Sequence, residues 1–95
     1  KIMTAFLDEL NAIIKDKKRN PTQESYTASL FSKGKDRLLK KIGEEAGEVI
    51  IASKNNDRDE LKNEAADLIF HLMVVLEELD ISLSDVVDVL ESRNK

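Results

Sequence analysis

The chain has 95 residues with 15 basic and 19 acidic side chains, and its formal net charge of −4 disfavours binding to nucleic acid. It has no cysteine and one histidine, which excludes disulfides, Cys-based zinc sites and a multi-histidine metal site within one chain. No apolar stretch approaches the roughly 20 residues that span a bilayer, and no secretory signal is visible at the start. We therefore expect a soluble, cytoplasmic protein of one domain.

The first part of the chain has helical periodicity and no alternating strand pattern. A first helix is predicted to end near Arg19, because Asn20-Pro21 follows it. Residues 20–27 are predicted to form a loop, and a short helical turn over 28–33 ends at Gly34. The apolar stripe of the first helix is flanked by Leu7 and comprises Ile2, Phe6, Leu10, Ile13 and Ile14.

Two longer helices are predicted on either side of a polar turn. The first covers residues 36–54, and the turn covers residues 54–59. Asp57 is a plausible N-cap for the second, which continues to about Leu79. Glu60, three residues after Asp57, completes a pattern like a capping box.

The last part of the chain indicates how the core is completed. Residues 80–83 break the preceding helix, and Ser84 is predicted to cap a last helix that ends near Arg93. Residues 68–76 are apolar on nearly all sides, so their helix needs cover that a second copy of the chain most easily supplies. We expect an all-α domain over residues 1–95: a four-to-five-helix protomer with a central antiparallel helical hairpin, completed as a helical bundle by dimerisation.

Two acidic pairs are placed symmetrically about the polar turn. Glu45 and Glu48 precede the turn, and Glu64 and Asp67 follow it. Positions 48 and 64 are centred on residue 56, as are positions 45 and 67, so in an antiparallel hairpin each residue faces its counterpart. All four acids lie toward the apolar side of their helices, where a hard cation such as Mg²⁺ would offset their repulsion. A solvated, salt-bridged helical hairpin is the alternative interpretation.

Basic residues share the helical stripe that carries Glu48. Arg37, Lys41 and Glu44 precede Glu48 at intervals of about one turn. Two interpretations remain open for this stripe. It forms weak ion pairs along the helix, or it binds phosphates beside the metal, and Lys33 and Lys35 could then extend the phosphate site.

Other residues near the acids also have more than one interpretation. Glu44 lies at the rim of the acidic stripe and could act as a base, support a metal ligand or be a surface acid. His71, one turn beyond Asp67, could be a satisfied core residue or could contact a metal ligand or substrate. Tyr26 could cap a helix or stack on a base. Gly43 and Gly47 are expected to allow close helix packing, with room for substrate as the alternative.

The pattern Glu44-Glu45-x-x-Glu48 followed by Glu64-x-x-Asp67 resembles the motif of the all-α nucleoside triphosphate pyrophosphohydrolases, the MazG-like superfamily. Within that superfamily the chain is similar to the phosphoribosyl-ATP pyrophosphohydrolases over about residues 5–92. Three segments carry the closer likeness: residues 25–31 with Gly34, residues 41–48, and residues 66–72. Phe70 departs from the pattern, because tyrosine more often precedes the histidine there.

The resemblance implies Mg²⁺-dependent hydrolysis of the α–β phosphoanhydride of 1-(5-phosphoribosyl)-ATP to 1-(5-phosphoribosyl)-AMP and pyrophosphate, the second step of histidine biosynthesis. It also implies a homodimer. The implied metal ligands are Glu45, Glu48, Glu64 and Asp67. The implied catalytic residues are Glu45 and Glu44, and Glu44 would orient or deprotonate the attacking water. The residues that would bind substrate or its phosphates are Lys33, Arg37, Lys41, Tyr26 and His71.

Three other functions compete with this one. A house-cleaning (d)NTP pyrophosphohydrolase of the same superfamily would act on plain or damaged nucleotides, and the Ser25-Tyr26-Thr27 segment argues against it. A non-catalytic helical interaction module would use the acids to bind a basic partner. A di-iron carboxylate bundle expects two E-x-x-H motifs, which this chain lacks.

Overall fold

The computed structural model describes the backbone of residues 2–94 and the side chains of residues 5–94. Within this range the chain forms five helices joined by short loops and turns and has no strand, which confirms the all-α prediction. None of the described helices is long and apolar enough to cross a membrane. The helices are α1 (Ile2–Arg19), α2 (Tyr26–Lys33), α3 (Lys35–Lys54), α4 (Arg58–Glu78) and α5 (Leu83–Ser92).

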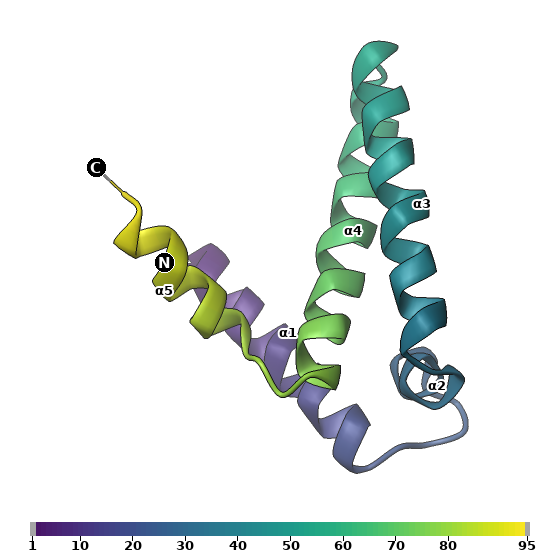
Figure 1. Ribbon diagram of the computed structural model, residues 1–95, viewed down its shortest axis with the longest axis vertical. Helices are drawn as coiled ribbons and strands as arrows, with labels where there is room; N and C mark the ends of the chain where they lie inside the picture. The colour runs from purple at the N-terminus through teal and green to yellow at the C-terminus, as the bar shows by residue number, and fades with distance from the viewer. Residues whose placement is uncertain (1, 95) are drawn as a thin grey trace.

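Two arms diverge from a shared base (Figure 1). In one arm α3 and α4 lie side by side, and a short turn joins them at the far end. In the other arm α1 contacts α5, while α2 packs at the base against α1, α3 and α4. The radius of gyration is 14.4 Å, against about 12 Å for a compact domain of this length. A large part of each arm is therefore left without intramolecular cover.

Side-chain caps fix the starts of α2 and α4. The Ser25 hydroxyl accepts a hydrogen bond from the backbone N–H of Ala28 at 3.0 Å, so α2 begins at Tyr26 and the predicted loop is shorter than expected. The Asp57 carboxylate accepts from the backbone N–H of Glu60 at 3.1 Å, which confirms Asp57 as the N-cap of α4.

The predicted cap of the last helix was wrong. Ser82, not Ser84, is the N-cap of α5, because Ser82 and Asp85 form a reciprocal capping box. Asp80, with φ of 59°, ends α4 in the left-handed conformation, in agreement with the predicted break. This turn lets the chain reverse toward α1.

The core lies where α1, α2, α3 and α4 meet. Its buried side chains are Ile14, Leu30, Leu38, Met73, Val74 and Val75, with Leu7, Leu10, Phe31, Ile42, Phe70 and Leu83 packed against them. The predicted stripe of α1 was partly wrong, because Leu7 packs on the core while Phe6 and Ile13 are 59% and 49% exposed. Ile2 lies outside the side chains that the structure describes.

Candidate metal and phosphate site

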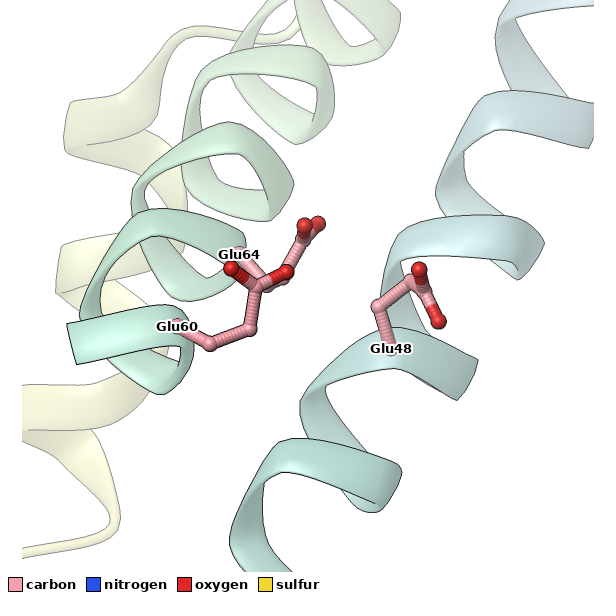
Figure 2. Close-up of side chains that lie close together, drawn as sticks. All are labelled: Glu48, Glu60 and Glu64. Carbon is pink, nitrogen blue, oxygen red and sulfur yellow. The ribbon is translucent and has the colours of Figure 1, made fainter. Parts of the chain in front are cut away.

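Three carboxylates gather between α3 and α4 near the turn that joins them. Glu48, Glu60 and Glu64 each offer an oxygen atom, and these atoms lie within 4.8 Å of one another. Figure 2 shows Glu60 and Glu64 projecting from α4 toward α3, which carries Glu48. The predicted juxtaposition of Glu48 and Glu64 is therefore present, and Glu60 joins them. We call these three residues the acidic cluster.

The electrostatics of the acidic cluster are unfavourable when it is fully ionised. The pKa of Glu64 is raised above its ordinary value, first by the hydrogen bond between its carboxyl group and that of Glu60. Burial and the negative charges of Glu60, Asp67 and Glu48 raise it further. A proton or a cation would relieve this repulsion. Carboxylate oxygens at the edge of solvent are a donor set that fits a hard divalent cation such as Mg²⁺.

The other two predicted acids lie outside the acidic cluster. Asp67 acts on Glu64 through its charge. Glu45 has a different partner, since its Oε1 atom lies 2.8 Å from Nδ1 of His71. Glu60 was assigned only to a cap on sequence grounds, although its position four residues before Glu64 places both on one helix face.

A cavity of about 570 Å³ lies along α3 beside the acidic cluster, lined by Gly43, Glu44, Glu45, Gly47, Glu48 and Ile51. A Cβ atom built on Gly43 or on Gly47 would meet no heavy atom within 4 Å. Within the described protomer these glycines therefore do not serve close helix packing, which was the expected role. They leave α3 bare where it borders the cavity.

A smaller cavity of about 170 Å³ adjoins the basic stripe and is lined by Arg37, Lys40, Lys41 and Glu44. The described side chains include no ion pair between these cations and Glu44 or Glu48. The alternative of ion pairs along the helix is therefore not what the structure contains. Glu44 lines both this cavity and the larger one.

Tyr26 and Lys33 stand at opposite ends of α2. Tyr26 is half exposed, its hydroxyl lies 3.0 Å from Nε2 of His71, and its ring stacks near Phe70 with centroids 6.3 Å apart. Lys33 is exposed at the end of α2, one residue before Gly34. Residues 26, 45 and 71 thus form a hydrogen-bonded row that joins α2, α4 and α3.

The family model for phosphoribosyl-ATP pyrophosphohydrolase matches residues 7–94, which include the acidic cluster and both cavities beside it. The chain belongs to this family. The likeness inferred from the motifs is confirmed.

Curated relatives that carry the same activity in their names match this chain over most of their length. A phosphoribosyl-ATP pyrophosphatase of Bacillus cereus (strain AH187) is 58% identical over 81 residues, or 85% of this chain and 76% of the relative. Enzymes of the same name from Bacillus thuringiensis (strain Al Hakam) and Bacillus anthracis (strain CDC 684 / NRRL 3495) are 57% and 56% identical over the same shares.

Proposed function

We propose that the chain hydrolyses 1-(5-phosphoribosyl)-ATP to 1-(5-phosphoribosyl)-AMP and pyrophosphate, as a step of histidine biosynthesis. The observation that carries this proposal is the family match over residues 7–94, a range that contains the acidic cluster. Cleavage of an α–β phosphoanhydride places additional negative charge on pyrophosphate. The site supplies acidic groups for a cation and basic groups for phosphates side by side.

Mg²⁺ is the cation that this donor set would hold. Glu48, Glu60 and Glu64 would bind it, with Asp67 and Glu45 as the further ligands that the sequence motif implies. When bound, the ion would neutralise phosphate charge and lower the pKa of the water molecule bound to it. The raised pKa of Glu64 supports this assignment, because it reflects a concentration of negative charge that a cation would relieve.

The chain's own side chains would then bind and orient the substrate. Arg37 and Lys41 donate to phosphate oxygens from the smaller cavity. Lys33, exposed at the end of α2, would extend this basic surface. Glu44 lies at the border of the two cavities, where it orients the attacking water or accepts its proton. The ring of Tyr26 is half exposed and stacks near Phe70, and its exposed part would contact the nucleotide.

A homodimer is the proposed working form, with the α3–α4 hairpin at the centre of the completed bundle. Ile69 and Leu72 on α4 are 50% and 43% exposed, although they belong to the apolar run. Apolar patches of this kind are typical of interfaces between subunits. Further large apolar side chains that the protomer leaves exposed are Phe6, Ile13, Leu39, Ile50, Ile51, Val87, Val89 and Leu90.

The test is pyrophosphate release from phosphoribosyl-ATP, measured with Mg²⁺ and with a chelator. We expect Mg²⁺-dependent release that Glu48→Gln abolishes while the helical circular-dichroism spectrum is unchanged. Glu91→Gln, an exposed acid on α5, is the matched control and should retain activity. Faster turnover of plain dNTPs than of phosphoribosyl-ATP would contradict the proposed substrate, and no pyrophosphate release at all would contradict the enzyme.

A further inference from the structure

His71 is buried and has a hydrogen-bonding partner on each side of its ring. Its side chain is 6% exposed, with Nδ1 2.8 Å from Oε1 of Glu45 and Nε2 3.0 Å from the Tyr26 hydroxyl. The ring of Phe70 packs edge-on against it with centroids 5.2 Å apart. With both nitrogens engaged and the ring covered, His71 has no free atom with which to bind a phosphate.

The partners of His71 define its tautomer. A carboxylate offers only acceptors, so Nδ1 carries the proton that points to Glu45. Nε2 of the neutral ring then accepts, and the Tyr26 hydroxyl donates to it. Tyr26 thereby selects the tautomer that Glu45 requires. The row runs from a half-exposed hydroxyl on α2, through a buried ring on α4, to a carboxylate on α3.

We infer that His71 is a positioning residue for Glu45, and that Tyr26 fixes the tautomer in which it does so. The inference rests on the proposed function, in which Glu45 is a ligand of the cation. The hydrogen bond occupies Oε1 of Glu45 and leaves Oε2 for the cation, on a residue that also lines the larger cavity. For His71 this role is the contact with a metal ligand that the sequence left open, in place of the direct substrate contact that the family resemblance implied for His71 and Tyr26.

Mn²⁺ binding, followed by electron paramagnetic resonance without substrate, tests the role independently of turnover. Loss of a hydrogen bond that orients a ligand typically weakens metal binding by about 10–100-fold. We expect a decrease of this size in the Mn²⁺ affinity of His71→Leu. His71→Asn places an amide donor near the former Nδ1 and should restore most of the affinity. Tyr26→Phe should weaken binding less than His71→Leu, while Ser32→Ala, which removes a hydroxyl from α2 that donates only to the Ser29 carbonyl, should leave it unchanged.

The wild-type protein provides a second test that needs no variant at His71. The chain has one histidine and one tyrosine, so imidazole ¹⁵N spectra report on His71 alone. We expect a protonated Nδ1 and an unprotonated, hydrogen-bonded Nε2, with the Nε2 signal shifting in Tyr26→Phe and the Nδ1 signal in Glu45→Gln.

A ring protonated only at Nε2 would overturn the inference, as would unchanged Mn²⁺ affinity in a folded His71→Leu variant. Both readouts remain valid if the wild-type protein fails to release pyrophosphate. Failure of the proposed function is thus distinguishable from failure of this inference.

Discussion

Glu64 is the residue of the site whose pKa is raised by its acidic neighbours. Glu60, Glu48 and Asp67 all act on its carboxyl group and raise its pKa. The folded chain therefore binds a proton at Glu64 more readily than the unfolded chain does. By linkage, the stability contributed by that proton is fully present below the unfolded pKa and is lost as the pH rises through the folded pKa.

Glu64→Gln should raise the melting temperature of the metal-free protein at pH 7. The amide removes a charge that the folded state disfavours, and the gain should disappear below the ordinary pKa of 4.5, where Glu64 is protonated in wild type as well. Melting curves in chelator at several pH values measure this. In saturating Mg²⁺ the wild-type protein should instead have the higher melting temperature. A difference in melting temperature that is equal at every pH would contradict the repulsion assigned to Glu64.

Lys41→Met tests the phosphate assignment of the basic stripe. The substitution keeps an apolar stem on the helix and removes the charge beside the smaller cavity. Loss of a charge-assisted bond that tightens in the transition state should lower kcat/KM for phosphoribosyl-ATP by about 10- to 100-fold. The melting temperature should hardly change, because the described side chains include no ion pair of Lys41.

The matched control is Lys62→Met. Lys62 forms an exposed pair with Asp59 at 3.4 Å on α4, so its loss should leave the kinetics unchanged. If Lys41→Met instead lowers stability with wild-type kinetics, Lys41 is a surface partner of the helix acids.

The residues of the site were predictable where helix geometry alone decides their position. The equal spacing of Glu48 and Glu64 from residue 56 was sufficient to predict that they lie close together across the turn. Glu60 was missed because its position after Asp57 satisfies a capping pattern, although its spacing of four residues from Glu64 already placed both side chains on one face of α4. The partner of Glu45 was left open, because the sequence allowed His71 to contact the core, a metal ligand or substrate, and the packing of α3 against α4 brings it to Glu45.

Among the elements, the helices were predicted well and their starts less well. Periodicity and the breaks at Pro21, Gly34 and Asp80 located all of them. Two starts were misplaced because each is set by a serine cap that was not identified from the sequence. Ser82 wins over Ser84 through its reciprocal bond with Asp85, and Ser25 starts α2 two residues earlier than the apolar pattern suggested.

Gly34 joins α2 to α3 in a conformation that other residues rarely adopt, with φ of 98° and ψ of 158°. Gly34→Ala should therefore cost about 1–3 kcal/mol in the free energy of unfolding. Urea denaturation at fixed protein concentration measures the loss.

Gly43→Ala is the contrasting variant in the same helix pair. Position 43 is within a helix and has open space where the Cβ atom would lie. The free energy of unfolding of Gly43→Ala should therefore rise by up to about 1 kcal/mol through helix propensity. Equal effects of the two variants would show that the backbone of Gly34 is not constrained.

At the scale of the whole molecule, the open two-armed shape leaves apolar surface on α4 that one chain does not cover. The combined substitutions Ile69→Lys and Leu72→Lys should convert the proposed dimer to a monomer at micromolar concentration, because two charges would be buried without partners. Sedimentation velocity measures the change. Asn63→Lys adds one such charge at an exposed site on α4 and should not alter the oligomer. A wild-type monomer would contradict the dimer itself.

The acidic cluster is local in sequence, since its members lie between residues 48 and 64 on two helices joined by a short turn. Closing so short a loop costs little chain entropy, and contacts of this kind tend to form early in folding. We therefore expect the three carboxylates to come together before α1 and α5 dock, so that their repulsion slows folding. Protonation or cation binding should then accelerate refolding of this chain much more than it slows unfolding, and the proposed cation would favour assembly of the site that holds it.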